Sequence, residues 1–430
     1  MSALLFIFQV SFFFFISRWL IVYTRDQLPA LYFLPGLSYK LLAGWGVGLL
    51  YTAYYQGGDT WAYYQDSLQL SSLFYERPSL YLQALFGDAS FVGLQFINQP
   101  RALFFTRICS IVSVFSLQNY WLISLSFSAS AFLASWWLMA MLKKYFQFKN
   151  FQLFIPFIIY PSVTFWSSGL LKESLAVSII FFLVGIFLHF YFKQFIGRRK
   201  DYTLLALWLV LALTLWKLKY YYAAILLPLL CLSYFLRWLK VVKKRHLSFL
   251  KLVLLAFLFI GSAFLLTMQL HPNLNPDRIL QALVLNHDLT VAASQEGAYV
   301  AFSDLKASPL SFVRYFPKAI FNGLFGPLPG WWRTDALYLI AGLENLLLLI
   351  LSLWALVVWL KNKTKIRHPL LILTCFIYLI SLAGFITIAS PNYGSLLRYR
   401  VAYMPFFTLI ILVILEGKME VIFSKFRKKM

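Results

Sequence analysis

Long apolar runs separated by five short basic stretches most constrain how this chain can fold. The stretches span 143–149, 193–200, 237–245, 361–367 and 418–429, and they hold more than half of the 38 Lys and Arg residues. Positive charge in short loops marks the cytoplasmic side of a membrane. We therefore expect all five stretches on that side, and we expect a functional site on the opposite, outer face.

The composition also indicates a membrane protein. Of the 430 residues, 61% are hydrophobic and only 12% are charged, about half the charged fraction of a soluble domain. The net charge of +23 lies in loops between apolar runs. This pattern fits contact with the anionic headgroups of membrane lipids, and we expect no nucleic-acid partner. The three cysteines are scattered in apolar segments and form no metal-binding spacing.

A membrane helix needs about 20 apolar residues. Helices of this kind are predicted at 3–23, 29–53, 118–142, 151–167, 170–192, 203–217, 220–239, 248–269, 336–360, 369–389 and 401–416. The prediction is an all-α polytopic integral membrane protein with about 11 (10–13) transmembrane helices. We expect one integral membrane domain over residues 1–430, because no hydrophilic linker interrupts the chain.

Two long outer loops are predicted. Residues 54–100 are acidic and aromatic, and 101–117 read as an amphipathic helix in the outer interface, so that 54–117 form one outer segment. If 101–117 cross the membrane instead, the acidic loop moves to the cytoplasm. The second outer loop is 270–335. Within it, Pro and Gly interrupt the apolar run 321–332, which we therefore expect to be a re-entrant or interfacial segment.

The first of three outer-face motifs follows the second predicted helix. Gly57 and Gly58 allow a sharp exit from that helix. Asp59 would then act as a general base toward a sugar hydroxyl or hold a divalent cation. The aromatic residues that follow are predicted to stack on sugar rings; they are Trp61, Tyr63 and Tyr64. The alternative is a helix cap with interfacial aromatic residues.

The second motif is the turn 166–174, which contains Ser167, Ser168 and Gly169 before Lys172 and Glu173. Charged groups in the first turn of a membrane helix are costly and usually functional. Adjacent residues do not face each other on a helix, so we expect Lys172 and Glu173 to have separate partners. Such a turn with helix N-terminal amides also suits a phosphate; the alternative is snorkelling to the interface.

The third motif, 392–400, contains Arg398 and Arg400 at the outer edge of a predicted helix. Their position opposes the charge rule, so a negative group should compensate them. A pyrophosphate held by the guanidinium groups is one candidate, and pairing with Glu344 or another acidic group is the alternative. Lys219 lies in another outer turn, also against the charge rule, and would widen the same anionic site.

At these residues the chain resembles bacterial membrane glycosyltransferases of the C superfamily (GT-C) and the related O-antigen and exopolysaccharide polymerases. The resemblance rests on Gly58-Asp59-Thr60 with Tyr63-Tyr64, on Arg398-Tyr399-Arg400 followed by Pro405, and on the topology. It implies a polyprenyl-phosphate or polyprenyl-diphosphate sugar donor on the outer face. The chain departs from the family in placing the acidic motif after the second span and in having Thr60 where the family has a second acidic residue.

The expected function is therefore sugar transfer from a polyprenyl-linked donor to a glycan or lipid-linked acceptor, in the bacterial inner membrane. Asp59 and Glu173 are the candidate catalytic residues, and the predicted substrate-binding residues are Trp61, Tyr63, Tyr64, Lys172, Lys219, Arg398 and Arg400. The residues suggest no metal site beyond a divalent cation at Asp59. Two alternatives stay open: a lipid-linked oligosaccharide flippase or other transporter, and a non-catalytic partner in envelope assembly.

Overall fold

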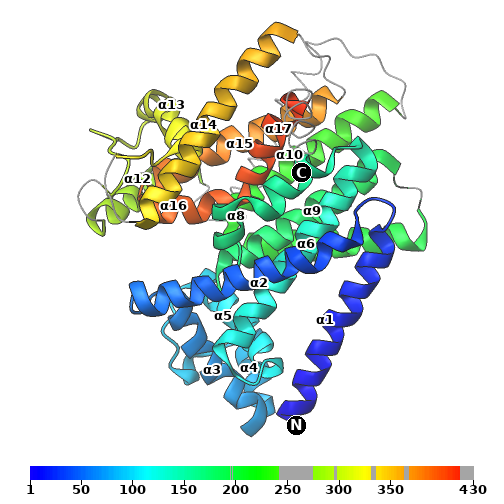
Figure 1. Ribbon diagram of the computed structural model, residues 1–430. Helices are drawn as coiled ribbons and strands as arrows, with labels where there is room; N and C mark the ends of the chain where they lie inside the picture. The colour runs from blue at the N-terminus through cyan, green and yellow to red at the C-terminus, as the bar shows by residue number, and fades with distance from the viewer. Residues whose placement is uncertain are drawn as a thin grey trace. The chain divides into compact units, whose positions relative to one another are not determined.

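The computed structural model of the chain describes residues 1–193, 195, 197–241, 275–294, 298–330, 336–362 and 368–416. These residues form helices, with an isolated β-bridge between Tyr299 and Asn392 (Figure 1). The prediction of an all-α protein is confirmed. Six of the described helices are long and apolar enough to cross a membrane, or seven if one bent pair counts as a single span. The predicted multi-pass membrane character is confirmed at this level.

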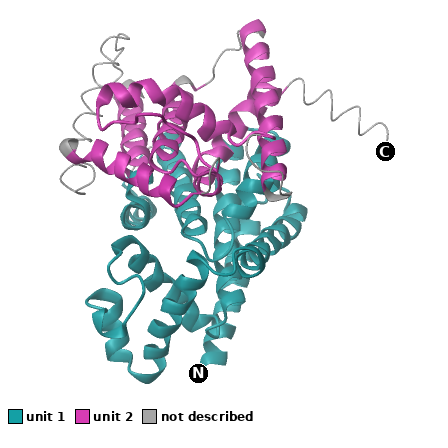
Figure 2. Ribbon diagram, turned by 90° about the vertical axis from the view of Figure 1, so that its left-hand side faces the viewer, with its two compact units in different colours: residues 1–223 teal, residues 224–430 magenta. Residues whose placement is uncertain are grey.

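The chain forms two compact units, residues 1–223 and 224–430 (Figure 2). Each unit has its own set of packed helices and is described by itself below. The prediction of a single integral domain stays a prediction.

The first unit contains α1 to α9 and the first part of α10. Their bounds are α1 Ser2–Thr24, α2 Phe33–Leu49, α3 Asp59–Glu76, α4 Pro78–Phe86, α5 Pro100–Phe115, α6 Tyr120–Phe146, α7 Asn150–Phe154, α8 Pro161–Trp166, α9 Lys172–Lys193 and α10 Arg199–Val241. Helices α6 and α9 form the most extensive helix pair of this unit.

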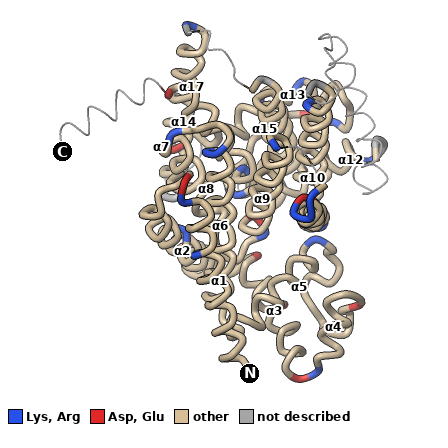
Figure 3. The backbone as a smooth tube through the Cα atoms, turned by 90° about the vertical axis from the view of Figure 1, so that its right-hand side faces the viewer, with Lys and Arg blue, Asp and Glu red and all other residues tan. Residues whose placement is uncertain are grey.

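One end of the first unit collects basic residues. The rings of Tyr145 and Phe192 stack 4.7 Å apart and hold the C-terminal ends of α6 and α9 side by side. The ammonium of Lys200, at the start of α10, lies 6.0 Å from the ring centre of Tyr23 near the end of α1. The basic residues at the C-terminal ends of α6 and α9 therefore lie at one end of the bundle. Figure 3 marks all Lys and Arg residues in blue along the backbone.

The predicted outer segment 54–117 lies at the opposite end of α1 and is itself helical. Helices α3, α4 and α5 pack around a buried apolar cluster, and Leu5 at the beginning of α1 packs against the same cluster. The buried carboxylate of Asp66 accepts hydrogen bonds from the amides of Gln95 (3.0 Å) and Phe96 (3.1 Å), which fastens the α4–α5 connection to α3. Helix α5 forms where an interfacial helix was predicted.

The helices differ from the predicted spans at two places. Residues 151–167 are broken into α7, a π-turn at Ile155–Ile159 and α8, because Tyr160 leaves helical geometry before Pro161. Proline lacks the amide that would continue the hydrogen-bond ladder. An outer turn at Lys219 was expected between the predicted spans 203–217 and 220–239. The two spans instead form one helix, α10, with a break at the single residue Lys219, where φ is −147° and ψ is 75°.

The second unit contains the rest of α10 and six further labelled helices. They are α12 Pro276–Ala292, α13 Pro309–Phe325, α14 Ala336–Asn362, α15 Pro369–Ala389, α16 Tyr393–Tyr399 and α17 Met404–Ile414. The predicted outer loop 270–335 thus holds two helices, and α13 packs along α15. The predicted motif 392–400 is mostly helical, and a bend of 67° separates Tyr393–Ala402 from Met404–Ile414. The predicted span 248–269 lies outside the described residues.

Candidate functional site

The turn between α8 and α9 is built around Gly169. This residue has φ +74°, in the left-handed region that favours glycine. Its amide donates to the hydroxyl of Ser128 on α6 at 2.9 Å. The hydroxyl of Ser174 donates back to the carbonyls of Gly169 (2.8 Å) and Leu171 (2.6 Å), which closes the first turn of α9. Lys172 and Glu173 therefore leave a turn whose backbone is fixed on both sides.

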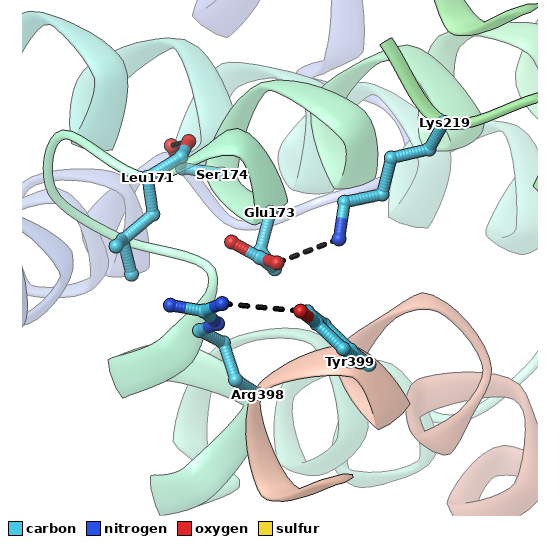
Figure 4. Close-up of polar contacts among 6 residues, drawn as sticks. All are labelled: Leu171, Glu173, Ser174, Lys219, Arg398 and Tyr399. Atoms are coloured by element: carbon cyan, nitrogen blue, oxygen red, sulfur yellow. Dashed lines mark hydrogen bonds and ion pairs between the residues drawn. The ribbon is translucent and has the colours of Figure 1, made fainter. Parts of the chain in front are cut away.

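A buried ion pair lies directly after this turn. The Nζ of Lys219 donates to the Oε1 of Glu173 at 2.6 Å, and the two side chains are 5% and 3% exposed (Figure 4). The lysine comes from the break in α10, where non-helical backbone interrupts the helix. A buried pair of this kind is costly to break, because removing one partner leaves a charge without compensation.

Lys172 has a different partner from Glu173. Its ammonium lies 4.8 Å from the ring centre of Tyr63 on α3, a distance at which a cation is attracted to an aromatic face. The prediction that Lys172 and Glu173 have separate partners is confirmed. Lys172 also lies within electrostatic range of Lys219, Glu173, Asp59 and Arg101. The second motif and the beginning of α3 are thus brought together within the first unit.

Two further cations extend this group. The guanidinium of Arg101, in the first turn of α5, lies 5.4 Å from the ring centre of Tyr220, just beyond the break in α10. The ammonium of Lys217 lies 5.7 Å from the ring centre of Phe104. We call Arg101, Lys172, Lys217 and Lys219, together with Glu173 and Asp59, the cationic cluster. Its four positive and two negative side chains give it a positive excess.

Asp59 is the first residue of α3 and is exposed. Gly58 precedes it with φ 102° and ψ −170°, a backbone conformation that only glycine adopts readily. A carboxylate at a helix N-terminus is stabilised by the helix dipole. The helix-cap alternative for the first motif therefore has a physical basis, while the exposure of Asp59 leaves its carboxylate accessible to a hydroxyl group.

The aromatic residues of the first motif contact protein rings. Trp61 stacks on Tyr120 with ring centres 4.3 Å apart, and the Tyr64 hydroxyl donates to the carbonyl of Gln118 at 2.9 Å. Tyr63 is 4% exposed and stacks on Phe96 at 4.6 Å, in addition to its contact with Lys172. These rings hold α3 against α5 and α6; sugar stacking by them stays a prediction.

The third motif belongs to the second unit. The Nη2 of Arg398 donates to the hydroxyl of the neighbouring Tyr399 at 3.2 Å (Figure 4). Arg400 is 1% exposed; its Nη1 donates to the carbonyl of Gly326 at 3.3 Å, and its Nη2 lies 3.6 Å from the Oε1 of Glu344. The alternative of pairing with Glu344 is therefore realised for Arg400. The convergence of this motif with the other two stays a prediction of the sequence.

No group of three or more His, Cys, Asp or Glu side chains within the described part of the chain is arranged to hold a metal ion. A divalent cation at Asp59 stays a prediction. Arg101 belongs to the cationic cluster, although it is not among the site residues predicted from the sequence. Its signal in the sequence is a cation in a segment expected on the outer face.

No protein-family model matches the chain, and neither a curated protein nor a solved structure matches it.

Proposed function

We propose that this protein is a multi-pass membrane glycosyltransferase or glycan polymerase that uses a polyprenyl-phosphate or polyprenyl-diphosphate sugar donor. The observation that supports the proposal is the cationic cluster, in which Lys219 pairs with Glu173 and Lys172 contacts Tyr63 on α3, the helix that begins with the exposed Asp59. A fixed cationic site can stabilise the negative charge that develops on a leaving phosphate, which is a large source of catalysis.

The proposed topology has about 11 membrane spans, with the segment 54–117 and the cationic cluster on the outer face of a bacterial inner membrane. The arrangement of the first unit supports it, because the basic ends of α6 and α9 lie away from the end that carries α3 to α5. A lipid-linked donor would then reach the cluster laterally from the bilayer, and its phosphate would be the counter-charge for the cations.

In the proposed reaction the acceptor hydroxyl oxygen forms a bond to the anomeric carbon of the donor sugar. The bond between that carbon and the phosphate oxygen breaks, and its electron pair leaves with the phosphate. Asp59 accepts the hydroxyl proton. Lys172 and Arg101 neutralise the leaving phosphate. Glu173, predicted as a second catalytic carboxylate, would orient Lys219 through their 2.6 Å contact. Arg398 and Arg400 stay predicted additions to the phosphate site.

Sugar transfer in proteoliposomes tests the proposal. Purified protein is reconstituted with a radiolabelled polyprenyl-phosphate sugar, and product is compared for the wild type, D59N and K172M. We expect both variants to lose at least about 100-fold in turnover, since general acid–base catalysis and charge stabilisation each contribute factors of this size. E76Q is the matched control, because Glu76 is an exposed carboxylate at the other end of α3. Unchanged turnover in D59N and K172M would contradict the proposal.

A transporter is the second candidate, and the broken helices favour it. Discontinuous membrane helices often form the substrate sites of transporters, and this chain breaks between α7 and α8 and at Lys219 in α10. The same proteoliposomes separate the two functions. Movement of a fluorescent lipid-linked oligosaccharide between leaflets without formation of product would favour the transporter. A scaffold protein would show neither activity.

A further inference from the structure

Lys40 is a buried lysine that the proposed reaction does not use. It lies in the middle of α2 and is 1% exposed. Its Nζ donates to the hydroxyl of Ser167 at 2.5 Å and to the carbonyl of Thr164 at 3.3 Å. No carboxylate pairs with it among the residues that the structure describes. A lysine buried in an apolar helix bundle is costly, so its two contacts need an explanation.

Both contacts of Lys40 are made at the C-terminal end of α8. The last carbonyls of a helix lack partners within the helix, and a cation there satisfies a carbonyl and interacts favourably with the helix dipole. The carbonyl of Thr164, two residues before α8 ends at Trp166, accepts from Lys40 and also, at 2.6 Å, from the hydroxyl of Ser168. The Ser167 hydroxyl that Lys40 contacts is also bonded to the carbonyl of Val163 at 2.5 Å. Lys40 thus ties α2 to the point where α8 stops.

The segment that begins there is the turn leading to Lys172 and Glu173. One helical turn after Lys40, α2 comes so close to this segment that a Cβ added at Gly44 would lie 3.1 Å from the amide of Gly169. It would also lie 2.0 Å from the Ser128 hydroxyl, which accepts the amide of Gly169. Lys40 and Gly44 therefore both contact the turn between α8 and α9. Lys40 bonds to its beginning, and Gly44, which has no side chain, lets α2 approach Gly169 closely.

We infer that Lys40 is a positioning residue, which fixes the turn between α8 and α9 and through it the place of Glu173 beside Lys219. The structural part of this inference stands on the contacts of Lys40 alone. Its consequence for sugar transfer rests on the proposed function. Lys40 is not proposed to contact the substrate.

Hydrogen exchange of the full-length protein in detergent tests the structural part. In K40M, amides of the peptide covering 165–173 should exchange at least about tenfold faster than in the wild type, a change that corresponds to about 1.4 kcal/mol. Amides in the second half of α6 and of α9 should keep their rates. K143M is the matched control, since Lys143 makes one comparable hydrogen bond, to the Oδ1 of Asn150 at 3.0 Å, on the same bundle.

Two results would overturn the inference. Unchanged exchange at 165–173 in K40M would show that Lys40 does not hold the turn, and an equal increase throughout α6 and α9 would show that it supports the bundle in general. The variant S167A, alone and combined with K40M, adds a double-mutant cycle. If Lys40 acts through Ser167, the effect of K40M on the turn is smaller in the S167A background.

Activity measurements then separate this inference from the proposed function. If both hold, K40M lowers kcat for sugar transfer by about tenfold or more and raises KM, because the displaced turn carries both Lys172, which neutralises the leaving phosphate, and Glu173, which orients Lys219. K143M should leave both parameters unchanged. If the wild type has no transferase activity, the proposed function fails, whereas the exchange experiment still decides the place of Lys40. If K40M loosens the turn and kcat stays at the wild-type value, the positioning of Glu173 is refuted.

Discussion

At the scale of single residues, the ion pair between Glu173 and Lys219 has the clearest energetic consequence. Both side chains are almost fully buried, so both charges have lost most of their contact with water. We expect E173Q to lower the free energy of unfolding by about 3–5 kcal/mol, because it removes the carboxylate charge that the buried Lys219 ammonium contacts at 2.6 Å. Unfolding in mixed micelles with increasing SDS measures this difference.

The matched comparison is the double variant E173L/K219M, which removes both charges. Replacing a buried ion pair by apolar side chains of similar volume is often close to neutral. The double variant should therefore be more stable than E173Q. E76Q, which changes an exposed carboxylate, should stay within about 0.5 kcal/mol of the wild type. A double variant less stable than E173Q would contradict this prediction, because it would show that the two charges do not mainly compensate each other.

The sequence alone could show that Lys172 and Glu173 need different partners, because neighbouring residues point in different directions on a helix. It could not show that Glu173 meets Lys219, since 46 positions separate them. Nor could it show that Lys40 reaches the end of α8, 124 positions away. These contacts depend on how α2, α9 and α10 pack, and the residue pattern of a single helix does not show which other helices it packs against.

At the scale of elements, the turn between α8 and α9 depends on the backbone of Gly169. Alanine there has two costs: the residue keeps a positive φ, and its Cβ would lie 3.2 Å from the side chain of Val47. We expect G169A to destabilise the protein by about 1–3 kcal/mol. G93A is the control, because Gly93 also has a positive φ of 76° but has open space around it.

Comparison of these two variants separates strain from crowding. The excess loss of G169A over G93A, measured by the same SDS unfolding, reports the contacts with Val47 and with the carbonyl of Gly44. Equal losses would assign the whole effect to the backbone conformation.

The bounds of α1, α6, α9, α14 and α15 could be predicted from the length of their apolar runs. The break at Tyr160 could not be predicted from apolar length. Pro156 and Pro161 carried that information in the sequence.

At the scale of the whole molecule, charge predicted which helix ends lie together in the first unit. The cations of Lys144 and Lys193 are close enough to interact, and the α3–α5 segment packs at the other end of α1. Charge counts could not reveal that residues 54–117 fold into three packed helices, because helix packing is set by buried apolar contacts such as Leu70, Ala84 and Val114. Which of the two ends faces the cytoplasm is a separate question that labelling can answer.

We expect the α3–α5 end to face outward. A cysteine replacing Phe86, which is 84% exposed at the end of α4, is introduced into a chain whose own cysteines are replaced by alanine. A membrane-impermeant thiol reagent should label F86C in intact cells, because the basic loops hold the opposite end in the cytoplasm. K144C, at the end of α6, should react only after lysis. If both sites react from the same side, α5 crosses the membrane and the outer-face site is lost. If the two sites exchange sides, the cationic cluster faces the cytoplasm, and the proposed reaction on the outer face is contradicted.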